Sequence, residues 1–273
     1  MNRWRYVITI IVLLLVFSGC SNKQDTTEEE TAEKDNSVKT QVEGTYDETL
    51  DVIVTDDFAY RIEDEAALLS EVLTYKESVV VPDILLYEGK EYPIEIIGEN
   101  AFQDASAFRE ITLPEGLREI QAGAFYGCDN ILEITIPDSV EKYGDGIFFN
   151  CERLEKIVLG DGLEGIPDET FSNCYALSEV QYPDGLLYIG AEAFWGCENL
   201  KKFTFSPKLV SVGSRAFYGS AVEALEIQST SLKISEDIFE GMDDLKTLTV
   251  PADDEKDYKA LDSLSEVTVN VLK

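Results

Sequence analysis

The sequence of 273 residues contains no histidine, and basic residues are scarce. Its 22 lysines and arginines stand against 54 aspartates and glutamates, which gives a formal net charge of −32 at pH 7. Without histidine, the chain lacks the commonest general base and the commonest metal ligand. A strongly negative surface also repels nucleic-acid phosphates. We therefore expect no nucleic-acid partner, and we expect cations, basic proteins or neutral ligands to be favoured, unless the charge serves solubility alone.

Motifs of enzymes are absent as well. No stretch of the sequence matches a phosphate-binding loop, a nucleophile elbow or an acidic calcium loop. The acidic runs at residues 28–30 and 253–255 are typical of solvated surface. With so many carboxylates in the chain, the proximity of any two carries no information. The sequence predicts a protein that is not an enzyme and that holds no metal and no cofactor.

A long hydrophobic run occurs at the N-terminus. Arg3 and Arg5 precede an apolar run at residues 7–17, which is shorter than the roughly 20 residues that a membrane-spanning helix needs. Small residues and then Cys20 follow this run. Such an order is typical of a secretory signal peptide, which we predict over residues 1–19.

The end of this signal, Phe17-Ser18-Gly19-Cys20, resembles the lipobox of bacterial lipoproteins, although that family usually has leucine where this chain has Phe17. The resemblance implies cleavage before Cys20 and diacylation of its thiol. Two or three acyl chains suffice for stable attachment. We therefore expect a lipid-anchored protein on the extracytoplasmic face of the cell membrane. The alternative is an ordinary signal peptide followed by an incidental cysteine.

Residues 21–49 contain nine acidic and three basic residues, with only four apolar ones. Such a segment buries too little surface to offset the entropy that ordering removes. We predict that residues 20–49 form the lipidated cysteine and a disordered acidic tether.

From residue 96 onward the sequence repeats itself. A phenylalanine recurs every 23 residues, with one last step of 22, and an apolar residue stands five positions before each phenylalanine. The two columns are Phe102, Phe125, Phe148, Phe171, Phe194, Phe217 and Phe239, and Ile97, Ile120, Tyr143, Ile166, Ile189, Val212 and Ile234. A short alternating strand pattern follows each phenylalanine, as at residues 111–114. This period is typical of leucine-rich repeats, whose stacking closes a continuous core. We predict a strand-rich α/β fold, a right-handed solenoid of about seven 23-residue repeats.

The clearest copy of the unit spans residues 189–200 and reads Ile-Gly-Ala-Glu-Ala-Phe-Trp-Gly-Cys-Glu-Asn-Leu. It is similar to the repeat of the BspA-like leucine-rich-repeat family of bacterial surface proteins, over residues 96–251. Residues 57–62 and 91–94 resemble the β-rich lead-in of that family, and Val250, Pro251 and Tyr258 resemble its closing segment. The resemblance implies an N-terminal cap at residues 50–95, a C-terminal cap at residues 252–273, and a role in surface attachment or binding.

Four cysteines each stand three residues after a phenylalanine of the repeat: Cys128, Cys151, Cys174 and Cys197. Strands stacked at about 5 Å would place the first and last about 15 Å apart, which excludes one zinc site with four cysteine ligands. Disulfides between neighbouring repeats have a suitable spacing, but stacked side chains point the same way. We therefore favour a ladder of buried thiols that serve as small core residues.

The outward positions of the predicted strands form two columns along one face. The candidate ligand-binding residues on this face are Glu110, Thr112, Glu133, Thr135, Lys156, Glu179, Gln181, Lys202 and Thr204. Solenoids commonly bind partners on such a surface. The alternative is that the threonines are simply good strand formers on a solvated face.

The residue after the repeat phenylalanine is aromatic in four of seven repeats, at Tyr126, Phe149, Trp195 and Tyr218, with a gap at Ser172. If each phenylalanine points inward, its neighbour points partly outward. These residues then form a broken ladder of exposed rings, which is a candidate contact site for protein or for sugar faces. The alternative is that the rings pack on one another.

Two function classes follow. The first is a surface lipoprotein, expected as a monomer, that binds a protein or glycan partner in adhesion or cell–cell interaction. The second is a structural or accessory envelope lipoprotein without a dedicated external ligand. The sequence separates the two poorly, because both need only a secreted, anchored solenoid.

Overall fold

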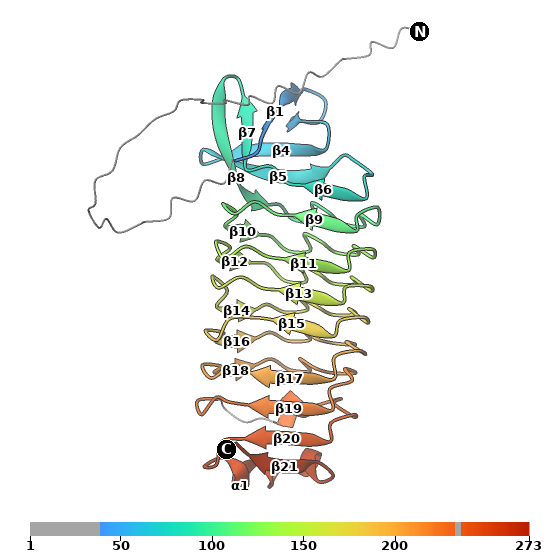
Figure 1. Cartoon of the computed structure of the whole chain (residues 1–273), viewed down its shortest axis with the longest axis vertical. Coiled ribbons are helices and arrows are strands. Elements are labelled where there is room, and N and C mark those ends of the chain that lie inside the picture. The colour runs from blue at the N-terminus through green and yellow to red at the C-terminus, as the bar shows by residue number, and fades with distance from the viewer. Residues whose placement is uncertain (1–38, 233–235, 273) are drawn as a thin grey trace, which may run out of the picture. The chain divides into compact units, whose positions relative to one another are not determined.

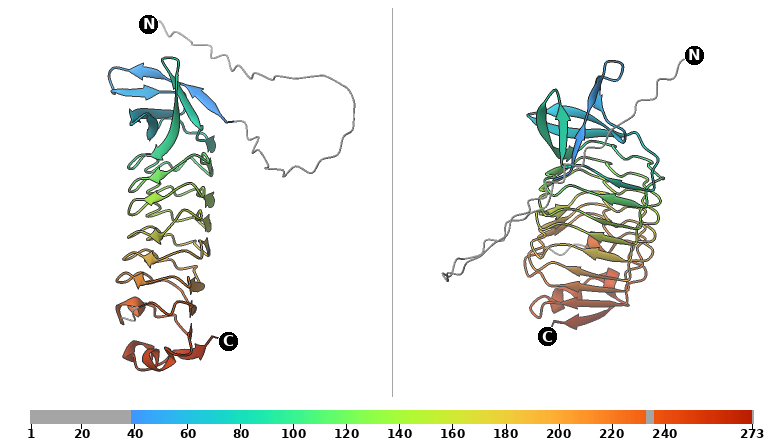
Figure 2. Two further views of the ribbon diagram at one scale, coloured as in Figure 1. Left: turned by 90° about the vertical axis from the view of Figure 1, so that its left-hand side faces the viewer. Right: turned by 45° about the horizontal axis from the view of Figure 1, so that its top comes forward.

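The computed structural model describes residues 39–232 and 236–272 (Figure 1). The predicted signal peptide, Cys20 and the tether up to residue 38 lie outside these ranges, as does Ile234. The described chain is rich in short strands, which follow one another along a stack of similar turns (Figure 2, left). The predicted strand-rich solenoid with a 23-residue spacing is confirmed.

The N-terminal part is a twisted sheet with the strand order β1-β7-β8-β5-β4-β3-β2. Its strands are β1 (Gln41–Glu43), β2 (Thr45–Asp47), β3 (Val52–Val54), β4 (Phe58–Glu63), β5 (Ala66–Val72), β7 (Ile84–Tyr87) and β8 (Lys90–Ile97). Strands β1 and β2 lie in residues that we predicted to be disordered tether, so the C-terminal end of that prediction is wrong. The reason is pairing: β1 adds in parallel to the edge of β7, and Val42 packs against the core. Composition alone does not reveal main-chain pairing of this kind.

Along one side of the solenoid, nine described strands follow one another and form what we call the strand face. They are β6 (Ser78–Val80), β9 (Glu110–Thr112), β11 (Glu133–Thr135), β13 (Lys156–Val158), β15 (Glu179–Gln181), β17 (Lys202–Phe205), β19 (Ala224–Ile227), β20 (Thr247–Val250) and β21 (Thr268–Val271). Strand β6 pairs in parallel with β9, and β21 pairs in parallel with β20. The solenoid therefore has about nine turns rather than seven, because both regions that we predicted as caps each contribute a strand to this face.

A second ladder of two-residue strands runs along the stack. Its strands are β10 (Glu119–Ile120), β12 (Lys142–Tyr143), β14 (Gly165–Ile166), β16 (Tyr188–Ile189) and β18 (Ser211–Val212), and β8 joins it by pairing with β10. The remaining short elements are η1 (Glu236–Phe239), α1 (Glu255–Tyr258) and η2 (Asp262–Leu264).

The repeat phenylalanines form the centre of the core. From Phe102 to Phe217 all of them are buried, and neighbouring rings stack with centroids 4.9–5.7 Å apart. At one end Phe58 contacts Phe102 edge-on, and at the other Tyr258 contacts Phe239 edge-on. Aromatic side chains from the flanking segments therefore cover both ends of the column.

From Phe102 to Phe217, each phenylalanine lies in a tight turn between two residues with left-handed backbone. Phe125, for example, lies between Gly123 (φ 61°) and Gly127 (φ 66°), and Phe194 between Glu192 (φ 56°) and Gly196 (φ 69°). Left-handed backbone suits glycine best, and asparagine or aspartate next. Each turn also forms main-chain hydrogen bonds with the turn of the next repeat. The N–H of Phe125, for example, donates to the carbonyl of Ile147 at 2.9 Å. Main-chain bonds thus link the turns as well as the strands.

Candidate functional site

The strand face carries the predicted outward columns. In β9 and β11 the outer residues are exposed and the middle residues, Ile111 and Ile134, are buried. The ladder aligns Glu133 with Lys156 and Glu179, and Thr135 with Val158 and Gln181. Lys202 is exposed on β17, and Thr204 is half-buried. The structure therefore brings the nine candidate residues onto one surface, in the order in which the repeat predicts them.

Charges on the strand face differ between its middle and its N-terminal part. The Lys156 ammonium lies 3.0 Å from Glu179, and the Gln181 amide also donates to that carboxylate. Both contacts lower the pKa of the Glu179 carboxyl, and the contact from Lys156 has the larger effect. Among the described residues, neither Glu110 nor Glu133 has a salt-bridge partner. Both line an open hollow of about 400 Å³ between β9 and β11, together with Thr112 and Thr135. Two uncompensated carboxylates beside hydroxyl groups favour a basic or a hydrogen-bonding ligand.

The predicted ladder of exposed rings is corrected by the structure. Tyr126, Phe149, Trp195 and Tyr218 are all half-buried. They stack in two pairs, with the Tyr126 and Phe149 centroids 5.3 Å apart and the Trp195 and Tyr218 centroids 4.4 Å apart. The buried Ser172 separates the pairs. Stacking at this distance gives the rings a packing role, because each covers a face of its neighbour.

The four repeat cysteines are free and buried, which agrees with the predicted ladder of buried thiols. Each thiol donates a weak hydrogen bond to the carbonyl of a phenylalanine 26 residues earlier, as Cys151 does to Phe125 at 3.1 Å. Burial raises the pKa of the Cys151 thiol to about 12. Since the thiolate is the reactive form, these cysteines are unreactive in the folded protein.

A thiol titration checks this assignment. Under denaturing, non-reducing conditions we expect free thiols at all four repeat cysteines, and in the native protein at pH 8 we expect none of them to be alkylated rapidly. Mass spectrometry after alkylation reads out both states. Fewer free thiols, with a mass loss that matches disulfides, would contradict the packing role.

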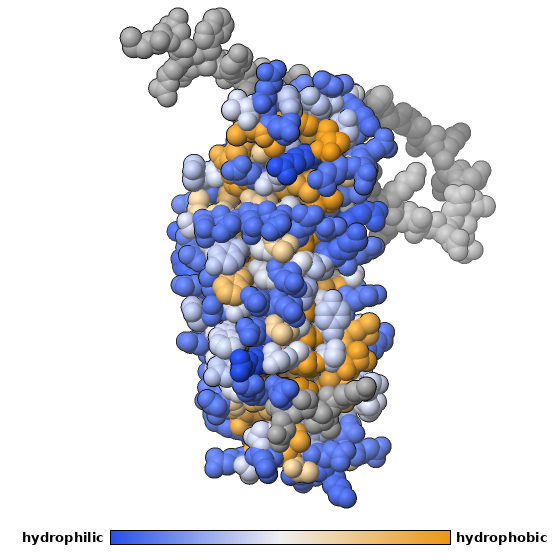
Figure 3. All heavy atoms as spheres, turned by 180° about the vertical axis from the view of Figure 1, so that it is seen from behind, coloured by the Kyte–Doolittle hydropathy of each residue, from blue (hydrophilic) through white to orange (hydrophobic). Residues whose placement is uncertain are grey.

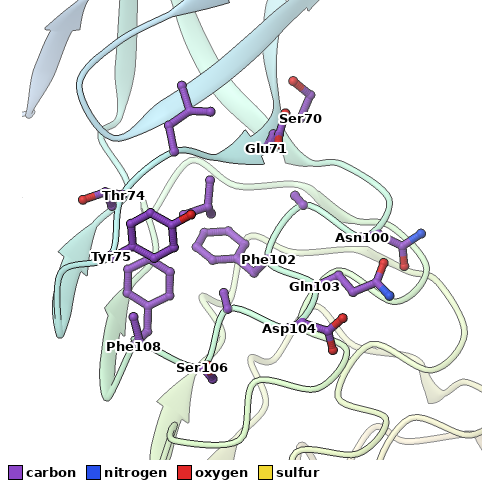
Figure 4. A pocket seen from close by; sticks show the side chains of 15 residues that line it. Ser70, Glu71, Thr74, Tyr75, Asn100, Phe102, Gln103, Asp104, Ser106 and Phe108 are labelled. Carbon is purple, nitrogen blue, oxygen red and sulfur yellow. The ribbon is translucent and has the colours of Figure 1, made fainter.

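A second hollow lies where the N-terminal sheet meets the first repeat (Figure 4). It has a volume of about 870 Å³ and is lined by residues 70–75 and 100–108. Tyr75 is 92% exposed at this hollow, and Asn100, Gln103 and Asp104 add polar groups. This hollow leaves no signal in the sequence, because residues 70–75 precede the repeat and carry no motif. The amide, hydroxyl and carboxylate groups could hydrogen bond to a polar ligand.

No group of three or more histidine, cysteine, aspartate or glutamate side chains with a geometry suited to a metal ion occurs in residues 39–232 and 236–272. Over the same ranges, none of the helices has the length and apolar character to cross a membrane. The face opposite to that of Figure 1 is mostly hydrophilic, with apolar patches between (Figure 3).

A solved structure shares this architecture, and two others are similar over part of their length. A leucine rich cell surface protein from Faecalibacterium prausnitzii A2-165 is 18% identical, with a TM-score of 0.55, and the match covers 81% of this chain and 72% of that one. A leucine-rich repeat protein from Bacteroides ovatus is 22% identical (TM-score 0.44; 80% and 76% covered). A leucine rich repeat protein from T. pallidum is 21% identical (TM-score 0.47; 72% and 83% covered). At these identities the first likeness shows a shared fold. Comparison with curated proteins gave no match.

Comparison with models of sequence families identifies the family as well as the fold. The model of the BspA type leucine rich repeat region matches residues 91–186 and 164–261, with six copies of the repeat. These matches span more than half of the chain and include the phenylalanine column, the strands β9 to β20 of the strand face and the cysteine ladder. The protein belongs to the BspA-type leucine-rich-repeat family.

Proposed function

We propose that this protein is a cell-surface lipoprotein that binds a protein or glycan partner on its strand face, in adhesion or cell–cell interaction. The observation that carries the proposal is the register within the sheets of the strand face, which aligns outward side chains in columns along β11, β13 and β15 and along β17, β19 and β20. A rigid, regular surface binds at low entropic cost, because its side chains are already positioned. We place the contact at Glu110, Thr112, Glu133 and Thr135, with Lys156, Glu179, Gln181, Lys202 and Thr204 extending it, and we propose that the protein acts as a monomer.

The uncompensated carboxylates decide which partner is favoured. Glu110 and Glu133 lie beside threonines in a shallow hollow, and the protein as a whole is strongly acidic. A partner with a basic patch is steered toward such a surface. The name of the Faecalibacterium prausnitzii relative, a leucine rich cell surface protein, supports the proposed location.

Reversing two charges tests the strand face. We expect the double substitution Glu110→Lys and Glu133→Lys to weaken partner capture by about tenfold or more, since charges at a contact set both association and specificity. The measurement is affinity capture of labelled surface proteins and immobilised glycans by the full-length protein. The matched control is Glu152→Lys with Glu198→Lys, two exposed acidic residues of the turns, which should bind like the wild type.

Two results would overturn this proposal. If both double variants lose partner capture equally, binding depends on net charge rather than on the strand face. Failure of the wild type to capture any partner would favour the accessory envelope role instead.

The anchor has its own test. Wild-type protein is expected in the membrane fraction, and Cys20→Ser is expected either in the soluble fraction or as an uncleaved precursor, because acylation needs the thiol. Fractionation and intact-mass measurement give the answer. An unmodified Cys20 in the mature wild-type protein would disprove lipid anchoring.

A further inference from the structure

The strand face is interrupted at two places, between β9 and β11 and between β15 and β17. Strands β11, β13 and β15 form one sheet, and β17, β19, β20 and β21 form another, with no pairing between β15 and β17. Figure 1 shows these two strands farther apart than the paired strands on either side. The second ladder is continuous at this level, because β16 pairs with β18 through Tyr188–Ser211 and Ile189–Val212. The solenoid therefore opens on one side only.

Three aromatic side chains distinguish the opening between β15 and β17 from the opening between β9 and β11. Phe203 and Phe205 point inward from β17, and Tyr182 directly follows β15. The Tyr182 ring stacks on Phe203 at 5.3 Å, and Phe203 also contacts Phe194 and Phe217, each at 5.0 Å. The positions equivalent to Phe203 in the other repeats are aliphatic: Ile111, Ile134, Ile157, Val180, Leu225 and Leu248. The opening between β15 and β17 is therefore lined by aromatic rings, whereas aliphatic Ile111 and Ile134 lie at the opening between β9 and β11.

The two strand edges that face the gap are unpaired. The Gln181 carbonyl accepts a hydrogen bond from the N–H of Leu159, on the β13 side. The Phe205 carbonyl accepts one from the N–H of Gln228, on the β19 side. Since successive residues of a strand direct their main-chain groups to opposite sides, those of Val180, Lys202 and Thr204 face the gap. The Tyr182 hydroxyl donates to the Thr204 carbonyl. Unpaired strand edges are otherwise protected in proteins, because they bind other strands readily.

The gap is also hollow, and its lining includes both apolar and polar groups. A space of about 180 Å³ is lined by Val180, Tyr182, Leu200, Lys202, Phe203 and Thr204. Val180 is half-buried, whereas Ile134 and Ile157 in its column are buried. Lys202 has no salt-bridge partner among the described residues, although the protein is strongly acidic.

We propose that the gap between β15 and β17 is a strand-addition site for an extended segment of a partner polypeptide. The proposal rests on the proposed function, and it names the chemistry of the partner. Only an extended peptide backbone offers N–H and carbonyl groups at the spacing that two strand edges require. Alternate apolar side chains of that segment fill the hollow beside Val180 and Phe203, and an acidic side chain pairs with Lys202.

A peptide selection tests the site. Random dodecapeptides displayed on phage are selected on the full-length protein, and enriched peptides are expected to alternate apolar residues and to include an acidic one. A gap-closing variant, Tyr182→Ile with Phe203→Ile, replaces the rings with the residue type of other repeats and should weaken peptide binding by about tenfold or more. The strand-face variant Glu110→Lys with Glu133→Lys should bind the same peptides like the wild type.

Hydrogen exchange gives a second measurement that does not depend on a core variant. In the free protein the amides of Val180 and Lys202 should exchange faster than those of Ile157 and Leu225, and a bound peptide should slow them. The proposal is overturned if no peptide is enriched, if the gap-closing variant folds and binds equally well, or if protection appears elsewhere. Loss of peptide binding in the strand-face variant alone would leave the proposed function standing and remove this site.

Discussion

Replacing Phe171 with alanine is expected to lower the free energy of unfolding by about 3–5 kcal/mol. Phe171 is fully buried, and its ring stacks between Phe148 at 5.7 Å and Phe194 at 5.3 Å. The ring lies in the middle of the column, so fraying of an end cannot collapse the cavity. Urea denaturation followed by circular dichroism measures the loss.

A matched aromatic control is available at Tyr75, which is 92% exposed. Tyr75→Ala should change the free energy of unfolding by no more than about 0.5 kcal/mol, as is usual for surface positions. A loss below about 1 kcal/mol for Phe171→Ala would show that the column does not form the core.

Gly190→Ala is expected to destabilise the fold by about 3 kcal/mol or more, at the upper end of what one added methyl group does in a packed core. Gly190 is buried, and its N–H donates to the Ile166 carbonyl at 2.7 Å. A Cβ atom there would meet main-chain atoms of Pro167 and Asp168 in the preceding repeat. Main chain cannot rotate away as a side chain can, so the two turns must separate.

Gly185 provides the control for this substitution, because an added Cβ atom would meet nothing within 4 Å. Gly185→Ala should be neutral or should stabilise by about 0.4–1 kcal/mol, through reduced freedom of the unfolded chain. Thermal unfolding of both variants separates the two mechanisms. Similar melting temperatures for Gly190→Ala and Gly185→Ala would show that the repeats do not approach each other closely at Gly190.

The regular parts of the fold could be predicted from the sequence, because one residue type recurs in one environment. Phe125 and Phe148 are 23 residues apart and lie in equivalent places, so the spacing alone indicates the stacking. The left-handed position two residues after each phenylalanine also left a signal, since Gly127, Asn150 and Asn173 all occupy it. At Glu169 and Arg215, which also adopt left-handed backbone, residue type gives no such signal.

The irregular parts could not be predicted, because they depend on contacts between repeats. The sequence shows Phe203 where other repeats have aliphatic residues, but residue type does not show how Tyr182 and Phe217 pack around that ring beside the opening between β15 and β17. Strand β1 is ordered by its pairing with β7, which lies 41 residues or more later in the sequence, although the local composition favours disorder. For the same reason, the rings of Trp195 and Tyr218 were expected to be exposed, although they cover each other.

The direction of the ladder bonds has a mechanical consequence. Hydrogen bonds between neighbouring strands run along the stack, from one turn to the next. A force that pulls the two ends of the described chain apart therefore loads these bonds one turn after another, as in opening a zipper, and not many at once, as in shearing. Turns joined by fewer bonds yield first. Because β15 and β17 share none of the strand-face pairing, and β9 and β11 share none either, extension under load begins at these two levels, and the paired turns between and beyond them remain intact as separate blocks.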